Sequence, residues 1–599
     1  MSFPTQESER GEPNMTLLKV RDLSVTFETD YVKIHAVRNV SFDIAPGEKV
    51  GFLGESGSGK TTTALALMGM IPKPGRISGG TAMMSNTDYL SLSPSGMRAK
   101  RMTEVSYIPQ GAMNSLNPVQ KIKHSILDGM IDHGRAPAKS EANDFVEDLL
   151  KRVGLPAVTA SRYPHELSGG MKQRVCIALA IALGPKLLIA DEPTSALDVI
   201  TQRQVMETLN MAQEELNSAL ILIGHDVGLM AQFTDSLMIM HQGQVVEHGK
   251  THEVLKNPRA EYTKKLIFSV PSVPDRRKVE DANDTTRKFK AANTLVEFRN
   301  VSKIFGGGMF SKSNTALHPL SMKLSTDRPQ IISVVGQSGS GKSTLGNLLL
   351  GFYSPSQGQV LYRNHDVRKL DKKGRSNFRR EVQAIFQDPY ASFNPFYPVD
   401  HAFIVPLLRF GIVQSKKQAY EKMAYCLEQV GLEPRAIFGA HSHQLSGGQR
   451  QRIMVARALS LEPKLLIADE PVSMVDASLR ASILDTIEKL RDENGISVIY
   501  ITHDLATAYK SADYVMVLHQ GRVVEAGLPQ SVICDPRHPY SELLVDSIPS
   551  PDPDRRWAAG RSLDEDQVGT LVHSKIATAI LRNRQDGFQL EFERMDDGF

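Results

Sequence analysis

The sequence predicts an α/β fold built from two tandem phosphate-loop domains. A glycine-rich loop of the form GxxxxGK[ST] occurs twice, as GESGSGKT at residues 54–61 and GQSGSGKS at residues 336–343. Each loop stands between a short apolar run and a helical pattern. From an LSGG stretch onward, the second half repeats the first at a constant offset of 278 residues, as Asp191 and Asp469 illustrate. A repeat this long indicates a duplicated domain, because solenoid repeats span roughly 20–50 residues.

The pattern of strands and helices supports a parallel-sheet core in each half. Strand-like alternation and apolar runs alternate with helical periodicity around each loop, which is typical of α/β domains. A nearly all-apolar helix, QRVCIALAIAL, follows the first LSGG and should be buried. The strands expected in the first half are 17–27, 35–44, 49–53, 219–224 and 236–249, the last with a turn at Gln242 and Gly243, and helices are expected from Thr61 and across 111–166.

The domain boundaries follow from composition. We expect a disordered leader at 1–14, a first domain at 15–270, a charged linker at 271–292, a second domain at 293–553 and a polar tail at 554–599. The second domain restarts with TLVEFRNVSKIF, which matches TLLKVRDLSVTF at the start of the first. Trp557 at the start of the tail is interpreted as a packing anchor.

Composition excludes several classes of protein. The chain is 41% hydrophobic and 23% charged with a formal net charge of +3, which argues against a nucleic-acid binder that relies on bulk positive charge. The apolar stretches are strand-sized, too short to cross a bilayer, and the polar N-terminus lacks a secretory leader. Three separated cysteines, Cys176, Cys426 and Cys534, fit reduced cytosolic thiols.

The glycine loops predict a phosphate site. Their glycines let backbone N–H groups surround phosphate oxygens at the positive end of the following helix. Lys60 and Lys342 would neutralise phosphate charge, and Thr61 and Ser343 would offer hydroxyls to Mg²⁺. The loop residues expected to bind the nucleotide are Gly54, Glu55, Ser56, Gly57, Ser58, Gly59, Lys60, Thr61 and Thr62, and then Gly336, Gln337, Ser338, Gly339, Ser340, Gly341, Lys342, Ser343 and Thr344.

The repeated LLIADE motif predicts the rest of the hydrolytic site. Its apolar run is a buried strand, and Asp191 or Asp469 at the carboxyl end would hold Mg²⁺ through water. Glu192 and Glu470, one residue later, would polarise the attacking water as general bases.

The remaining motifs resemble those of ATP-binding cassette (ABC) ATPases over residues 15–270 and 293–548. They are Gln110 and Gln387, the LSGG stretches, the SALD and SMVD segments, and His225 and His503. The resemblance implies two cassettes, each with an antiparallel β subdomain and a helical subdomain beside the parallel core. It further implies that each glutamine contacts Mg²⁺, that each histidine contacts the γ-phosphate, and that ATP lies between the loop of one cassette and the LSGG helix of the other. The implied opposing residues are Ser446, Gly447 and Gly448 for the first loop, and Ser168, Gly169 and Gly170 for the second.

Two further features remain open from the sequence. The family stacks adenine on an aromatic ring where Phe27 and Phe305 stand, but either could be a core strand residue, and Tyr31 competes for the role in the first cassette. SMVD replaces SALD in the second cassette, with bulkier Met474 and Val475 but with Asp476 retained, so we expect two competent sites with some asymmetry.

The segments after each cassette resemble the extension of oligopeptide, dipeptide and nickel importer ATPases. NPRAEYTKKLIFSVPSVP at 257–274 and DPRHPYSELLVDSIPSPDP at 535–553 share Pro-Arg, a tyrosine, an apolar turn and Ser-x-Pro. The resemblance implies ATP-driven import at the cytoplasmic face of the inner membrane, with two transmembrane permease subunits, a periplasmic or lipid-anchored solute-binding protein, and ATP and Mg²⁺ as ligands. Some relatives hold an iron–sulfur cluster in this extension, and none is expected here because the sequence has no cysteine between Cys176 and Cys426.

Alternative functions are a soluble twin cassette acting on ribosomes or DNA, and an exporter ATPase. The short linker of mixed charge and the scattered cysteines fit the soluble alternatives poorly, and the two extensions disfavour an exporter. The identity of the solute is not encoded in these motifs.

Overall fold

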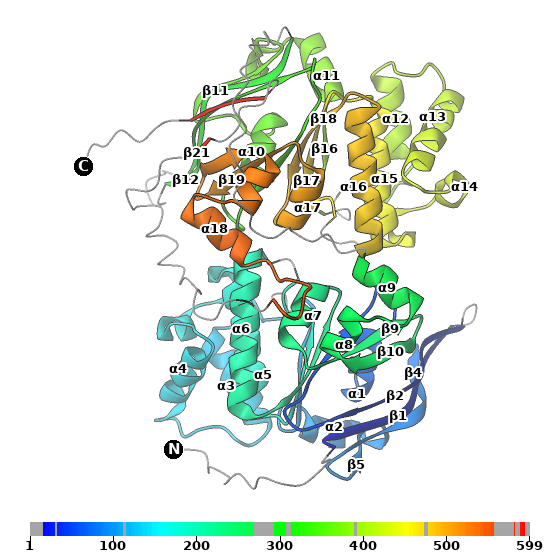
Figure 1. The fold of residues 1–599 in the computed structure, drawn as a ribbon, viewed down its shortest axis with the longest axis vertical. Helices are drawn as coiled ribbons and strands as arrows, with labels where there is room; N and C mark the ends of the chain where they lie inside the picture. The colour runs from blue at the N-terminus through cyan, green and yellow to red at the C-terminus, as the bar shows by residue number, and fades with distance from the viewer. Residues whose placement is uncertain are drawn as a thin grey trace. The chain divides into compact units, whose positions relative to one another are not determined.

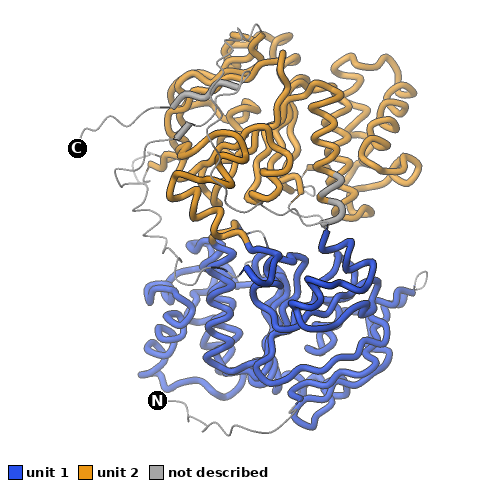
Figure 2. The backbone as a smooth tube through the Cα atoms, in the orientation of Figure 1, with its two compact units in different colours: residues 1–197, 201–268, 549–557 blue, residues 198–200, 269–548, 558–599 orange. Residues whose placement is uncertain are grey.

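The computed structural model describes most of both halves of the chain. The described residues are 16–29, 33–111, 115–195, 197–268, 293–306, 313–388, 392–472, 477–555, 557, 580–581 and 588–592. The predicted leader, the linker, Tyr31 and the SMVD segment lie outside them. The chain divides into two compact units, coloured separately in Figure 2.

Unit 1 contains a six-stranded sheet with the order β10-β9-β3-β8-β7-β6. Its strands β9 and β10 are labelled in Figure 1. All neighbouring strands are parallel except β9 and β10, which form a hairpin turning at Gln242 and Gly243. The parallel strands are buried along most of their length, because helices cover a parallel sheet on both faces. The strands are β3 (Lys49–Leu53), β6 (Val105–Ile108), β7 (Leu187–Asp191), β8 (Ala219–Gly224), β9 (Ser236–His241) and β10 (Gln244–Lys250).

A second, antiparallel sheet of unit 1 has the order β2-β1-β4-β5. It consists of β1 (Leu18–Glu28), β2 (Lys33–Ile44), β4 (Gly75–Met84) and β5 (Thr87–Asp88). Its inward residues, such as Val20 and Val25, share one hydrophobic core with Phe52 of β3 and Ala64 of the following helix. Burial of this shared face fixes the end of β3, where the first glycine loop begins.

The helices of unit 1 fall into two groups. Helix α1 follows the glycine loop, and α3, α4 and α5 pack together as a helical subdomain, with most residues of α5 buried as expected. The helices are α1 (Lys60–Leu67), α2 (Pro94–Lys100), α3 (Ile122–Asp132), α4 (Ala142–Arg152), α5 (Gly169–Ile181), α6 (Val199–Leu216), α7 (Val227–Phe233), α8 (Thr251–Lys256) and α9 (Glu261–Phe268).

Unit 2 repeats both sheets. Its mainly parallel sheet has the order β16-β17-β18-β13-β19-β20-β21, and its antiparallel sheet has the order β15-β14-β11-β12-β22. The strands are β11 (Thr294–Phe305), β12 (Asn314–Ser325), β13 (Ile331–Val335), β14 (Gln357–Tyr362), β15 (His365–Asp366), β16 (Val382–Ile385), β17 (Leu465–Asp469), β18 (Ser497–Ile501), β19 (Tyr514–His519), β20 (Arg522–Gly527), β21 (Ile580–Leu581) and β22 (Phe588–Phe592).

The helices of unit 2 also follow the first half. Helix α10 continues from the second glycine loop, and α12, α13, α14 and α15 form the helical subdomain around a core that includes Phe403 and Leu427. The helices are α10 (Lys342–Leu349), α11 (Lys372–Glu381), α12 (His401–Arg409), α13 (Lys416–Gln429), α14 (Pro434–Ile437), α15 (Gly447–Ser460), α16 (Ala477–Asp492), α17 (Leu505–Ser511) and α18 (Pro539–Asp546).

The architecture confirms the predicted fold class, with a parallel core, an antiparallel sheet and a helical subdomain in each cassette. Two strands come from the tail, where none was predicted: β22 pairs with β12, and β21 pairs with β20. Unit 1 also includes residues 549–557, and unit 2 includes residues 198–200. Among the described residues, no helix combines the length and hydropathy needed to span a bilayer.

Candidate functional site

The two glycine loops join a strand to a helix in a conformation that requires glycine. Gly59 and Gly341 cap α1 and α10 with φ of 100° and 103°, in the left-handed region that side chains disfavour. A Cβ on Gly54 would lie 2.2 Å from the carbonyl oxygen of Met240, and one on Gly336 would lie 2.1 Å from that of Leu518. Each loop is therefore pressed against the end of a neighbouring strand, with the helix N-terminus behind it.

The two loop lysines are buried and bonded to their own loops. Lys60 Nζ donates to the carbonyl oxygens of Gly54 at 2.7 Å and Glu55 at 2.8 Å. Lys342 Nζ donates to those of Gly336 and Gln337, both at 2.7 Å. Burial lowers the pKa of Lys342, although the nearby acidic residues act in the opposite direction. Both ammonium groups are thus held over the loop, where phosphate oxygens could replace the carbonyls.

Asp191 has the environment that a metal-associated carboxylate needs. It is fully buried at the end of β7, and its Oδ2 accepts a hydrogen bond from the Tyr107 hydroxyl at 3.0 Å. Its Oδ1 is buried without a hydrogen-bond partner. Burial raises the pKa of Asp191, while Thr61 and Tyr107 beside the carboxylate lower it. An orphaned carboxylate oxygen next to a threonine hydroxyl fits Mg²⁺, which prefers oxygen ligands.

Asp469 ends β17 in the same way in unit 2. Burial raises its pKa, and the Ser343 side chain opposes that shift. A small cavity beside it is lined by residues that include Ser343, Asn347 and Ala384. The Asp469 carboxylate and the Ser343 hydroxyl also suit Mg²⁺, which prefers oxygen ligands. A bound Mg²⁺ would offset the negative charge of the phosphates.

Glu192 lies at the centre of a hydrogen-bonded cluster in unit 1. Its Oε2 accepts from Gln110 Nε2 and from Ser195 Oγ, both at 2.8 Å, and its Oε1 lies 3.2 Å from His225 Nδ1. Burial raises the pKa of Glu192, but the hydrogen bond and charge of His225, the Ser195 hydroxyl and Lys60 outweigh it and lower the pKa to about 2. Since the carboxylate is ionised, His225 Nδ1 is the donor. The glutamate is therefore a fixed anion with a histidine beside it.

Glu470 repeats this cluster in unit 2. Its Oε2 accepts from Gln387 Nε2 at 2.8 Å, and His503 Nδ1 lies 3.1 Å from its Oε1. Burial raises the pKa of Glu470, but His503 and Lys342 outweigh burial and lower it. For His503, burial lowers the pKa, and the Glu470 carboxylate reverses this and raises it. Each partner thus stabilises the charge of the other.

Both glutamates have an unusual backbone. The φ of Glu192 is 45° and that of Glu470 is 48°, in the left-handed region that non-glycine residues seldom occupy. Such conformations cost on the order of 1–3 kcal/mol and persist where the surroundings enforce them. Here the backbone N–H of each glutamate donates to the adjacent strand, to Ile223 and to Ile501, both at 2.9 Å. The strain turns each carboxylate out of the sheet toward its glutamine and histidine.

The LSGG serines are N-caps. Ser168 Oγ accepts from the backbone N–H of Met171 at the start of α5, and Ser446 Oγ accepts from that of Gln449 at the start of α15. The glycines that follow, 169–170 and 447–448, form the first turns of these helices. Each signature therefore presents a helix N-terminus with small residues, which suits an anion.

The candidate adenine-stacking rings differ between cassettes. Phe27 is partly buried against the core of unit 1, and its ring packs where a Cβ on Gly75 would lie. Phe305 is 38% exposed and makes an edge contact with Tyr353, with Lys303 Nζ 5.0 Å from its ring centre. Stacking on either ring stays a prediction.

Two tyrosines in the extensions contact the glycine loops, which the sequence did not predict. The Tyr262 hydroxyl of α9 accepts from the backbone N–H of Glu55 at 3.0 Å, and the Tyr540 hydroxyl of α18 accepts from that of Gln337 at 2.9 Å. Each ring lies against a histidine at the end of a strand, His241 or His519, with the two rings tilted by 31° or 35°. The signal was present, because the two tyrosines recur at the same 278-residue offset as the catalytic motifs.

Comparisons with known proteins agree with this geometry. The ABC transporter family matches residues 37–195 and 317–473, and the oligopeptide/dipeptide transporter C-terminal region matches 246–295 and 524–570. Proteins named glutathione import ATP-binding protein GsiA are similar over nearly the full length: the one from Salmonella choleraesuis is 36% identical over 587 residues, and the one from Escherichia coli K12 is 35% identical over 589, with 93% of each chain covered in both cases.

Two solved structures of ATP-binding cassettes are similar to about two fifths of this chain each. The dimeric, post-hydrolysis form of the ATP-binding cassette MJ0796 with ADP and Pi is 27% identical and covers 39% of this chain and 98% of its own, with a TM-score of 0.36. The cbiO1 protein of Clostridium perfringens is 26% identical and covers 41% of this chain and 92% of its own, with a TM-score of 0.35. From the paired family matches and the full-length relatives, the chain belongs to the ABC transporter ATPases, as a tandem-cassette member of the oligopeptide/dipeptide importer family.

Proposed function

We propose that the chain powers uptake of short peptides such as glutathione through separate permease subunits. The observation that carries this proposal is the similarity to the GsiA proteins across both cassettes and both extensions, in the same order. The chain would act as a peripheral protein on the cytoplasmic face of the inner membrane. Two transmembrane permeases would form the path, and a periplasmic or lipid-anchored binding protein would deliver the solute.

Each nucleotide would bind between a glycine loop and the opposing LSGG helix. In site 1, Lys60 and the loop amides would hold the phosphates, and the N-terminus of α15 at Ser446 would face the γ-phosphate. Site 2 would pair Lys342 with the N-terminus of α5 at Ser168. ATP binding would then join the two cassettes, and hydrolysis would release them.

In each site the glutamate would polarise the attacking water. At a pKa of about 2, Glu192 is a weak base before nucleotide binds. The negative charge of ATP nearby raises the pKa of a carboxylate, which brings Glu192 closer to the range useful for proton acceptance. His225 would hold the carboxylate through Nδ1 and contact a phosphate oxygen with the other side of its ring, and His503 would act in the same way on Glu470 in site 2.

The metal would be held by oxygen ligands of this chain. In site 1 these are the Thr61 hydroxyl, Gln110 and the Asp191 carboxylate, whose Oδ1 has no hydrogen-bond partner. In site 2 they are Ser343, Gln387 and Asp469. We propose that the chain holds no iron–sulfur cluster.

Uptake assays test the proposed function. A strain lacking this gene is compared with one that expresses the wild-type chain or the double variant Lys60→Ala/Lys342→Ala, and uptake of labelled glutathione, a dipeptide and a tripeptide is measured. We expect uptake of at least one of these peptides to fall to background without the chain and with the double variant. Unchanged uptake of all three overturns the proposal of peptide import.

A further inference from the structure

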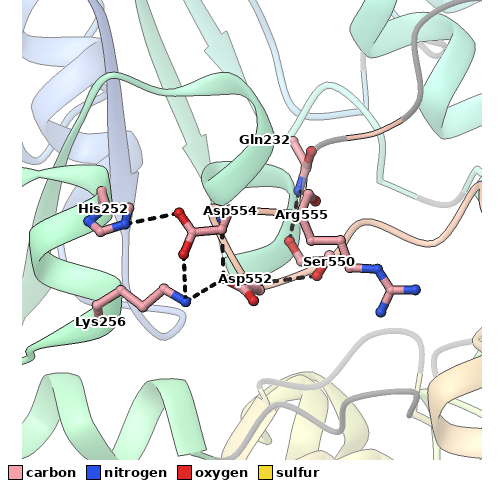
Figure 3. Close-up of polar contacts among 7 residues, drawn as sticks. All are labelled: Gln232, His252, Lys256, Ser550, Asp552, Asp554 and Arg555. Carbon is pink, nitrogen blue, oxygen red and sulfur yellow. Dashed lines mark hydrogen bonds and ion pairs between the residues drawn. The ribbon is translucent and has the colours of Figure 1, made fainter. Parts of the chain in front are cut away.

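A short segment at the end of the second extension lies on cassette 1. Residues 549–557 follow α18, yet they belong to unit 1. Figure 3 shows this segment along α7 and α8, where it contacts Gln232, His252 and Lys256. It is held on cassette 1 by hydrogen bonds, ion pairs and ring contacts, and it approaches the backbone of α7 closely at one glycine.

Gln232 of α7 binds the backbone of the segment at three points. Its Nε2 donates to the carbonyl oxygens of Ser550 at 3.0 Å and Arg555 at 2.9 Å, and its Oε1 accepts from the backbone N–H of Trp557 at 2.9 Å. One side chain thus fixes both ends of a turn. The turn is reinforced internally, because the backbone N–H of Arg555 donates to the carbonyl oxygen of Asp552 at 3.0 Å.

The acidic residues of the segment pair with basic residues of α8. Lys256 Nζ lies 2.6 Å from Asp552 Oδ1 and 3.1 Å from Asp554 Oδ2, and His252 Nε2 lies 3.1 Å from Asp554 Oδ1 (Figure 3). These groups are partly exposed, so each pair contributes little to stability. Their value is in fixing which part of the segment meets which turn of α8.

Trp557, at the end of the segment, contacts an aromatic ring and a guanidinium group of cassette 1. Its ring makes an edge contact with Phe233 at 5.4 Å between centroids, and the Arg203 guanidinium lies 5.1 Å from the ring centre. The sequence prediction that Trp557 is a packing anchor is consistent with these contacts.

Gly228 makes room for the start of the segment. A Cβ on Gly228 would lie 2.3 Å from the carbonyl oxygen of Pro549 and 3.0 Å from its carbonyl carbon. Real Cβ atoms do not approach backbone that closely, so this helix position must be glycine for Pro549 to lie where it does. Glycine is otherwise unfavourable inside a helix by about 1 kcal/mol relative to alanine.

Cassette 2 lacks the corresponding surface. At the 278-residue offset, Ala506 replaces Gly228, Lys510 replaces Gln232, Ser511 replaces Phe233, Gln530 replaces His252, Cys534 replaces Lys256 and Ala481 replaces Arg203. The first extension also lacks the matching carboxylates, with Pro274 and Arg276 where the second has Asp552 and Asp554. Receptor surface and segment are therefore both specific to one cassette.

We propose that residues 549–557 are an intramolecular docking peptide whose receptor is the α7–α8 surface of cassette 1. Since α18 lies in unit 2, docking gives the chain a second connection to cassette 1 in addition to the linker at 271–292. Because the receptor residues are replaced at the matching positions of cassette 2, the sequence provides this receptor surface in cassette 1 alone.

Trp557 is the only tryptophan of the chain, so its fluorescence reports docking in the full-length protein. In the wild type we expect blue-shifted emission with weak acrylamide quenching. Gly228→Ala and Gln232→Ala should shift emission to the red and raise the quenching constant about two- to threefold.

Gly228→Ala introduces the residue found in cassette 2 and favours the helix, so loss of docking is separable from loss of folding, which circular dichroism checks. Lys510→Ala, at the matched position of cassette 2, should leave the emission unchanged. The proposal is overturned if Gly228→Ala and Gln232→Ala both keep the wild-type spectrum and quenching.

The second connection is tested by cutting the linker. A protease site is placed within 271–292 of the full chain, and the cleaved protein is passed over a size-exclusion column without nucleotide. The wild-type halves should remain together at concentrations at which Gln232→Ala and Trp557→Ala halves separate, with at least a tenfold weaker association. Equal association in wild type and variants overturns the role of the segment as a connection.

Discussion

The two cassettes have nearly identical hydrolytic clusters and different surroundings. The glutamine–glutamate distance is 2.8 Å in both, and the histidine–glutamate distances are 3.2 Å and 3.1 Å. Next to the aspartate that ends the strand, however, unit 1 has Tyr107 where unit 2 has Ala384 and a small cavity. Only cassette 1 carries the docking surface for residues 549–557. The groups of the proposed catalytic clusters are alike in the two cassettes, and the differences lie in the residues around them.

The largest expected effect tests the likeness of the clusters. Glu192→Gln and Glu470→Gln remove the same carboxylate from matching neighbours, so each should lower ATP turnover at its own site by roughly 10²–10⁴-fold, the range for loss of a general base, and both should lower total phosphate release to the same extent. Phosphate release by the full chain at saturating ATP measures this. Nucleotide binding and thermal unfolding of each variant serve as controls, and both should remain close to wild type.

Unequal turnover of the two glutamate variants would contradict the likeness of the two clusters. If one variant keeps wild-type turnover while the other loses it, only one site hydrolyses ATP, and the proposal of two hydrolytic sites is wrong. A cause would then be sought outside the clusters, whose geometry matches.

A smaller effect is expected where the extensions touch the loops. Tyr540 is fully buried, so Tyr540→Phe leaves the Gln337 N–H without its acceptor, at a cost of about 1–3 kcal/mol in unfolding free energy. Tyr262 is partly exposed, and water can replace its hydroxyl in Tyr262→Phe, so the loss there should be below about 1 kcal/mol. Denaturant unfolding of the full chain compares the two, and equal losses would show that burial of the tyrosine does not control its contribution.

The sequence predicted the clusters because each depends on local patterns. An apolar strand ending in Asp191-Glu192 and a helix opening at Lys60 are set by a few neighbouring residues, and the sheet brings their ends together. The pairing of β22 with β12 was not predicted, because tertiary contacts decide which strand a short tail segment joins. Docking of residues 549–557 was also missed, since its signal is a glycine at position 228 that looks ordinary until Pro549 is placed beside it.

Lowering the pH should destabilise cassette 2 through two of its buried histidines. Burial lowers the pKa of His519 and His538 in cassette 2 to about 4, from an ordinary value of 6.5. Both are neutral in the folded chain, so their contribution is fully present above pH 6.5 and is lost as pH falls toward 4, because the unfolded chain binds the extra protons. Between pH 7 and pH 5 we expect cassette 2 to lose on the order of 1–2 kcal/mol per histidine.

A single substitution provides the control for this pH effect. Cassette 1 has Ala260 at the position of His538, so His538→Ala should flatten the dependence of the unfolding temperature of cassette 2 on pH between 6.5 and 4. Differential scanning calorimetry of the full chain measures it. An undiminished slope in this variant would assign the pH dependence to other groups.

The smallest expected effect concerns Tyr107. Its hydroxyl fixes Asp191 Oδ2 and leaves Oδ1 for the metal side, and burial raises the pKa of Tyr107, so it remains a donor at all physiological pH values. Tyr107→Phe should raise the Mg²⁺ concentration for half-maximal nucleotide binding at site 1 by a few-fold. Outer partners of directly bound metals contribute roughly 10- to 100-fold, and an aspartate that acts through water should contribute less. Fluorescent-nucleotide titration in a Lys342→Ala background isolates site 1.

The reciprocal change asks whether the tyrosine alone distinguishes the two metal sites. Ala384→Tyr places the ring beside Asp469, in the cavity lined by Ser343 and Asn347. In a Lys60→Ala background, it should lower the Mg²⁺ requirement of site 2 toward that of site 1. If Tyr107→Phe weakens site 1 but Ala384→Tyr does not strengthen site 2, the tyrosine acts only together with other residues of cassette 1, such as Leu65 at the position of Asn347. The Mg²⁺ requirement of each site would then depend on several of the residues around its aspartate acting together.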